Sequence, residues 1–96
     1  MKLVSISESP KANKKLVAVF ESDTGRRKSV HFGAAGMTDY TLGASKQQRE
    51  QYRTRHAKDL LTLDPTRAGF LSYGILWGRS RSREKNIAEY KDTFDL

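Results

Sequence analysis

The block Ala68-Gly69-Phe70-Leu71-Ser72-Tyr73-Gly74-Ile75-Leu76-Trp77 decides the fold, because it concentrates apolar and aromatic side chains in a chain that has few of them. An Asp-Pro-Thr-Arg sequence interrupts the chain just before it and offers Thr66 as a helix cap. We therefore predict a helix of about ten or eleven residues here. Its large side chains would surround most of the helix, as in a buried helix or one that meets a partner. They are Phe70, Tyr73, Ile75, Leu76 and Trp77.

The first third of the chain has the composition of a β-sheet. Residues 2–7 form a short strand candidate in which Val4 and Ile6 share one face. Residues 15–21 are rich in β-branched and aromatic side chains, and a Ser-Asp-Thr-Gly turn connects them to residues 26–32. The pattern predicts a β-hairpin with the first segment as an edge strand.

A glycine-containing loop and two further helices are predicted from the remaining segments. Residues 33–43 hold three glycines and no sustained period, so we expect a connecting loop there. The glycine spacing fits neither a dinucleotide fingerprint nor a P-loop. Ser45 is placed to cap a helix over residues 46–60, and Ser82 to cap a final helix through Phe94.

Together these segments predict an α+β fold, in which a small antiparallel sheet of two or three strands is followed by about three packed helices. A chain of 96 residues is long enough for one domain with a modest core. We expect a single small basic domain over residues 1–96, with a β-hairpin region in 1–32 and a helical region in 45–94.

The charge balance indicates an acidic partner. Eighteen Lys and Arg residues against eleven Asp and Glu residues give a net charge of +7, which favours nucleic acid, an anionic membrane or an acidic protein. Three cationic clusters could contact phosphates or acidic side chains. Their members are Arg26, Arg27 and Lys28, then Arg49, Arg53 and Arg55, then Arg79, Arg81 and Arg83.

Aromatic side chains stand near each cluster, which leaves two kinds of partner open. Tyr40, Tyr52 and Trp77 could stack on unpaired bases, although no sequence signature of a known nucleic-acid-binding module is present. The same clusters could dock acidic faces of neighbouring subunits, with Tyr40, Tyr52, Phe70, Tyr73 and Trp77 as core or interface anchors. Composition alone does not separate nucleic-acid binding from protein assembly.

The sequence contains no catalytic or metal-binding pattern. Cysteine is absent, and His31 and His56 lie outside any zinc-ligand spacing. The neighbours of His56 are Arg53 and Arg55 rather than a carboxylate that could orient it as a general base. We therefore expect no enzyme activity, no catalytic residues, no cofactor and no metal. No apolar stretch could span a bilayer and the first residues lack a signal-peptide core, so a soluble intracellular protein is expected.

Three segments resemble a small uncharacterised family of nucleocytoplasmic large DNA viruses, which includes algal and giant viruses. They are His-Phe-Gly-Ala-Ala-Gly-Met-Thr-Asp-Tyr-Thr at 31–41, Tyr-Arg-Thr-Arg-His at 52–56, and the apolar block at 68–77. The resemblance covers roughly residues 26–94 and leaves the amino-terminal strand outside. It implies a viral context without an activity that could be assigned to individual residues.

Within that viral context we predict a non-enzymatic virion component. A basic domain with an aromatic block and no base-recognition module suits a minor structural or capsid-associated protein, which binds acidic protein or genome surfaces. Its expected partners are other virion proteins or nucleic acid, and it could form an oligomer. The alternative is a module that binds DNA or RNA without sequence specificity.

Overall fold

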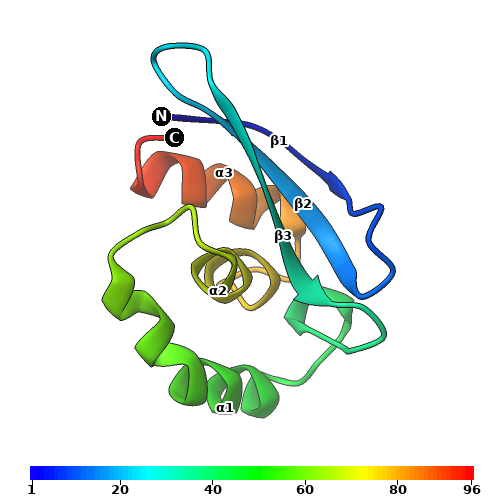
Figure 1. Ribbon diagram of the computed structural model, residues 1–96. Helices are drawn as coiled ribbons and strands as arrows, with labels where there is room; N and C mark the ends of the chain where they lie inside the picture. The colour runs from blue at the N-terminus through cyan, green and yellow to red at the C-terminus, as the bar shows by residue number, and fades with distance from the viewer.

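The computed structural model describes residues 1–96 and confirms the predicted α+β class (Figure 1). Three strands, β1 (Lys2–Glu8), β2 (Lys14–Glu21) and β3 (Arg27–Ala34), form one antiparallel sheet in the order β1-β2-β3. All helices lie on one side of this sheet in Figure 1. They are η1 (Tyr40–Leu42), α1 (Lys46–His56), η2 (Ala57–Thr62), α2 (Ala68–Leu71), η3 (Ser72–Leu76) and α3 (Arg83–Thr93).

The core lies between the central strand β2 and the α2–η3 segment. Alternation along β2 turns Leu16, Ala18 and Phe20 to the helical side, where all three are buried. Phe32 of β3 pairs with Leu16 of β2 and is fully buried. The apolar block contributes its own buried side chains, including Phe70, Leu71, Ile75 and Leu76. The block thus supplies the helical half of the core, as its composition predicts.

The register of β1 differs from the prediction because of a β-bulge. Leu3 pairs with Phe20, but the next paired residue is Ser5, so Val4 is the extra residue of the bulge. The shift brings Leu3 and Ile6 to the core side, whereas Val4 is 39% exposed. The expectation that Val4 and Ile6 share one face is therefore wrong, since period-2 alternation does not hold across a bulge.

The predicted loop at residues 33–43 is more ordered than its glycines suggest. Strand β3 continues through Ala34, and the short helix η1 begins at Tyr40. Asp39 caps η1 by accepting hydrogen bonds from the backbone N–H groups of Thr41 and Leu42. A structural capping role is the expected one for a loop aspartate, whereas the short helix that Asp39 caps was not predicted, because residues 33–43 show no sustained period.

The caps of the two longer helices are confirmed, although one helix is shorter than predicted. The Ser45 hydroxyl accepts from the Gln48 N–H while the Gln48 side chain accepts from the Ser45 N–H, which completes a capping box. Ser82 caps α3 in the same position. Helix α1 ends at His56, and the chain then tightens into the 3₁₀ helix η2 instead of continuing to residue 60.

The apolar block is one turn of α-helix followed by a π-helix. The N–H of Trp77 donates to the carbonyl of Ser72 at 3.1 Å, the i→i−5 bond of a π-turn. Thr66 does not cap this segment, because its hydroxyl donates to Asp64 at 2.6 Å and accepts from Lys28 at 2.7 Å. The predicted regular helix is therefore wrong in detail, and the π-turn decides where the last side chains of the block point.

Close approach of β3 to η3 depends on Gly33, which lies at a positive φ of 80°. A Cβ atom there would stand 2.7 Å from Cδ1 of the buried Leu76 and 3.3 Å from Cβ of Lys15. Gly36 has nearly the same φ, 81°, but a Cβ atom would meet nothing within 4 Å. Substitutions at these two glycines therefore separate the cost of backbone strain from the cost of overpacking.

We predict that Gly33→Ala lowers the free energy of unfolding more than Gly36→Ala does. Both substitutions should cost about 1–2 kcal/mol for the left-handed backbone, and Gly33→Ala should cost about 1–3 kcal/mol more for overpacking against Leu76. Urea denaturation of the two variants and the unchanged protein measures the difference. Equal losses would show that Leu76 moves aside without cost.

Candidate binding groove

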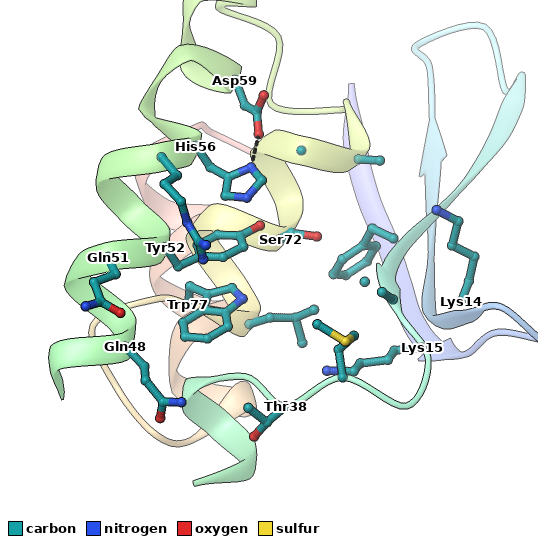
Figure 2. Close-up of a pocket in the computed structure, with 18 residues that line it drawn as sticks. Lys14, Lys15, Thr38, Gln48, Gln51, Tyr52, His56, Asp59, Ser72 and Trp77 are labelled. Atoms are coloured by element: carbon teal, nitrogen blue, oxygen red, sulfur yellow. Dashed lines mark hydrogen bonds and ion pairs between the residues drawn. The ribbon is translucent and has the colours of Figure 1, made fainter. Parts of the chain in front are cut away.

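A groove of about 700 Å³ opens between α1 and the end of the sheet, with the α2–η3 segment as its floor (Figure 2). Its volume lies within the range of about 300–1,000 Å³ that is usual for ligand sites. Side chains from β2, β3, α1, η2, α2 and η3 contribute to its wall, so the groove exists only in the folded chain.

Three stacked rings form the α1 side of the groove. Tyr52 and His56 are four residues apart on α1, which places them on one face, and their ring centroids are 4.2 Å apart. Trp77, which follows η3, stacks on Tyr52 at 4.4 Å with an interplanar angle of 8°. Because the rings of this stack cover one another's faces, they present their edges to the groove (Figure 2).

The edges of the stack are polar. In Figure 2 the indole nitrogen of Trp77 points toward the cavity, and the Tyr52 hydroxyl points toward Ser72. Burial raises the pKa of Tyr52, the charge of Asp59 raises it further, and the Ser72 hydroxyl opposes these effects in part. Tyr52 therefore stays neutral around pH 7 and can both donate and accept a hydrogen bond.

His56 has the carboxylate neighbour that the sequence analysis did not find. Its Nδ1 lies 3.1 Å from Oδ2 of Asp59, three residues further on, because the tightening into η2 brings the two side chains together. Asp59 thus orients the imidazole against Tyr52. No hydroxyl group hydrogen-bonds to His56, so the nucleophile–base contact of an activated serine or tyrosine is not formed in this structure.

Two cations of the groove are available to a ligand. Lys14 from β2 and Arg55 from α1 line the groove without an intramolecular ion pair or side-chain hydrogen bond. Lys15 also lines it, but its ammonium group is bound to Asp39 at 2.6 Å. The acidic member of the lining is Asp59, whose Oδ2 is held by His56. The groove therefore has a net positive lining.

Helix α1 is attached to the rest of the protein by polar contacts and stacked rings, since none of its residues is fully buried. Arg53 donates to the carbonyl groups of Tyr73 at 3.1 Å and Trp77 at 2.8 Å, and Arg49 donates to that of Gly78 at 2.9 Å. Burial lowers the pKa of Arg53, although a guanidinium group stays charged at any physiological pH. These bonds satisfy carbonyl groups that the end of η3 leaves without a helical partner.

The third cationic cluster is also largely occupied within the protein. Arg81 donates to the carbonyl of Ala44 at 2.9 Å and lies 4.2 Å from the centre of the Tyr40 ring. Arg83 donates to the Thr41 hydroxyl at 2.9 Å and lies 3.4 Å from Asp39. Tyr40 itself is buried.

The remaining predicted cations lie at the surface. Arg27 pairs with Glu21 at 3.0 Å, Arg79 pairs with Glu89 at 3.1 Å, and Arg26 is exposed. Lys28 is bound to Thr66. Several of the predicted partner-binding residues therefore already have a partner within the protein.

The anchor residues are similarly divided between core and groove. Phe70 is buried in the core, where it meets Phe94 edge-on at 5.2 Å, and Tyr73 lies under the guanidinium of Arg53 at 4.0 Å. Of the predicted residues, the structure brings Tyr52, Arg55 and Trp77 together at the groove.

Sequence reasoning missed several residues of the groove. Lys14, Gln48, Gln51 and Ser72 line it, and they come from three different elements. The signal that was available is the pair Tyr52 and His56 at helical spacing. The others could not be found, because their proximity depends on the position of α1 relative to the sheet.

The structure shows neither a helix that could span a membrane nor a cluster of metal ligands. None of its helices combines the length and apolar character needed to cross a bilayer. No group of three or more His, Cys, Asp or Glu side chains is placed to hold a metal ion.

Fold and groove together define a small basic α+β protein with an open, cation-lined groove of ligand size. The chain belongs to a family of unknown function (DUF5754), which matches residues 4–56. It is similar to the "Uncharacterized protein L851" of Acanthamoeba polyphaga mimivirus, with 33% identity over 81 residues, which cover 77% of this chain and 80% of that protein. No solved structure matches the chain significantly.

The mimivirus relative is consistent with the giant-virus resemblance. The family match begins at residue 4 and therefore includes most of β1, which the resemblance had left outside. It includes the segments at 31–41 and 52–56 but stops before the apolar block at 68–77.

Asp39 connects the groove side of β2 to α3 through a buried ion-pair network. Its side chain is 1% exposed and interacts with Lys15 at 2.6 Å and Arg83 at 3.4 Å, besides its bonds to Thr41 and Leu42. Burial alone would raise the pKa of Asp39, but the hydrogen bonds from Lys15 and Thr41 and the two positive charges outweigh burial and lower it. The folded state therefore favours the carboxylate form.

We predict that Asp39 makes the protein sensitive to acid. Its pKa is lower in the folded than in the unfolded chain, so its contribution is complete above about pH 4 and is lost as the pH falls through the folded pKa. Asp39→Asn should lower the free energy of unfolding by about 3 kcal/mol at neutral pH, because it leaves Lys15 without its counter-charge. The same substitution should also make the free energy of unfolding less dependent on pH in the acid range.

Urea denaturation between pH 7 and pH 2.5 measures both effects. Asp64, whose pKa is lowered by hydrogen bonds from Thr66, contributes acid dependence to both proteins, so the profile of Asp39→Asn should become flatter but not level. Asp92→Asn, which removes an exposed carboxylate without a side-chain hydrogen bond, is the matched control. An equal slope with and without Asp39 would contradict the prediction.

Proposed function

We propose that this protein is a non-enzymatic binding module that holds single-stranded nucleic acid in the groove without sequence specificity. The observation that carries the proposal is the combination of Lys14 and Arg55, both without an intramolecular partner, with an aromatic wall in an open groove of about 700 Å³. Proteins that bind single strands also combine a cationic groove with aromatic side chains, although the rings there stack on bases, whereas here they offer polar edges.

The distribution of arginines favours the groove over a broad cationic face. Four of the nine cations predicted to bind acidic partners, Arg49, Arg53, Arg81 and Arg83, bond to backbone carbonyls, Thr41 or Asp39. A side chain committed to such bonds has fewer donors left for phosphates. Arg55 has no such commitment, and its charge reaches Tyr52, where it offsets part of the rise in the Tyr52 pKa that burial causes. The cations at the groove are thus the ones best placed for a strand.

An unpaired strand fits this site better than a duplex. The ring edges and the hydroxyl groups lie within the groove, where only a base that is not paired could reach them. Phosphates of the same strand would remain near the solvent, where Lys14 and Arg55 can neutralise them. The giant-virus relative supports a role during infection without indicating a stage.

We predict that Arg55→Gln and Lys14→Gln weaken binding of single-stranded oligonucleotides. Each loses one phosphate contact, so the slope of log affinity against log salt should fall by about 0.7. The loss should be about equal across sequences. Fluorescence anisotropy with labelled single-stranded and duplex DNA and RNA at several salt concentrations measures affinity and slope.

Lys91→Gln is the control for net charge, because Lys91 is an exposed residue of α3, which does not line the groove. If all three variants weaken binding equally, the affinity is only a net-charge effect and the groove proposal is wrong. Stronger binding of duplex than of single strands would also contradict it.

A role in protein assembly within the virion is a second candidate, which two exposed leucines favour. Leu61 and Leu63, at the end of η2, are 80% and 85% exposed, and Leu63 adopts a left-handed backbone with φ of 54°. An apolar side chain held outward in an uncommon conformation suggests contact with another protein.

If these leucines dock on a virion protein, Leu61→Ser combined with Leu63→Ser should abolish incorporation into particles without changing the free energy of unfolding by more than about 0.5 kcal/mol. Mass spectrometry of purified particles measures incorporation, with Arg55→Gln as the comparison. Normal incorporation of the double variant would remove the leucines from this role.

A further inference from the structure

The indole N–H of Trp77 is a hydrogen-bond donor in the groove that has no partner within the protein. Trp77 is the single tryptophan of the chain, and its side chain can donate one hydrogen bond and accept none. No protein group accepts this bond, and the nitrogen points toward the cavity (Figure 2). The position of the ring is fixed by the Tyr52 stack and by the bond from Arg53 to the Trp77 carbonyl. A fixed donor of this kind suits an acceptor on a ligand.

Other polar groups line the same groove. The hydroxyl groups of Tyr52 and Ser72 lie on the same side of the groove (Figure 2). Gln51 lines the groove without an intramolecular side-chain hydrogen bond, and Gln48 keeps its amide NH₂ free because only its oxygen is used in the capping box. The lining therefore offers several donors and acceptors at the edges of flat or apolar surfaces, which matches the edge of a heterocyclic base.

The cationic side chains of the groove add a second requirement for its ligand. Lys14 and Arg55 come from opposite sides, the sheet and α1, and both lack an intramolecular counter-ion. A ligand that satisfies the whole lining needs a planar body with acceptors on its edge and a separate anionic group. A nucleotide has both, and the groove volume of about 700 Å³ exceeds the lower end of the range for small-molecule sites.

We propose that the groove is a nucleotide subsite, in which an acceptor on the edge of the base takes the Trp77 indole N–H and the phosphate lies toward Arg55 and Lys14. This inference rests on the proposed function, because it assigns the contact that a bound strand makes in the groove. Every nucleobase carries an acceptor on its edge, so the contact distinguishes nucleotides from bare phosphate without selecting a sequence. The same unit could come from a strand or from a free nucleotide.

The fluorescence of Trp77 can be used to monitor binding. Since it is the single tryptophan, its emission monitors the groove directly. The full-length protein is titrated with a single-stranded oligonucleotide, with an abasic oligonucleotide of equal phosphate number, and with nucleoside 5′-monophosphates. Only ligands that carry a base should change the emission of Trp77, and the base-containing strand should bind more tightly than the abasic one.

Trp77→Phe separates the indole N–H from the ring, because phenylalanine can keep the stack on Tyr52 but cannot donate. By anisotropy, this variant should bind the base-containing strand about three- to tenfold more weakly, the equivalent of one hydrogen bond. Its affinity for the abasic strand should be unchanged. Tyr73→Phe, which removes an aromatic hydroxyl outside the groove, is the matched control and should bind both strands normally.

The outcomes separate this inference from the proposed function. If strands bind but the abasic strand binds equally well and Trp77→Phe has no effect, the nucleotide subsite is wrong and strand binding stands. If free nucleotides bind as tightly as the strand, the subsite stands and the strand proposal fails. If no nucleotide or strand binds better than the net-charge control allows, both are wrong.

Discussion

The position of α1 depends on two arginines that bond to the carbonyl groups at the end of the π-helix. Helix α1 has no fully buried residue, so aliphatic packing does not hold it in place. Arg53 and Arg49 connect it to the carbonyls of residues 73, 77 and 78, and the stack of Tyr52 on Trp77 reinforces the contact. Because this attachment lies on the η3 side, the space between α1 and the sheet stays open as the groove.

The fold class could be predicted because each major element carries a local signal. A continuous run of β-branched and other apolar residues defines β2, and alternating apolar residues define β3. Ser45 and Ser82 precede the longer helices, where the first backbone N–H groups need an acceptor. The deviations arise where a single residue changes the period. The bulge at Val4 and the π-turn after Ser72 each add one residue to a regular pattern, and the periodicity of the sequence does not indicate such insertions.

The candidate site was less accessible to prediction, because charge does not reveal what an arginine binds. Arg53 and Arg55 are two residues apart and identical in type, yet one holds backbone carbonyls and the other faces the groove. Their different roles follow from helical geometry: residues two apart point about 200° apart around the axis. No sequence pattern indicates that Lys14 belongs to the site, since its position at the groove depends on tertiary structure.

The polar attachment of α1 has a consequence for its dynamics. Elements that bury little apolar surface open locally at a lower free energy than the strands and helices around a core. We therefore expect the amide hydrogens of α1 to exchange with solvent before those of β2, while the sheet and the α2–η3 segment remain folded. A groove with one such wall can widen for an incoming molecule without unfolding the core, and the width of the opening becomes a property of an ensemble rather than of one conformation.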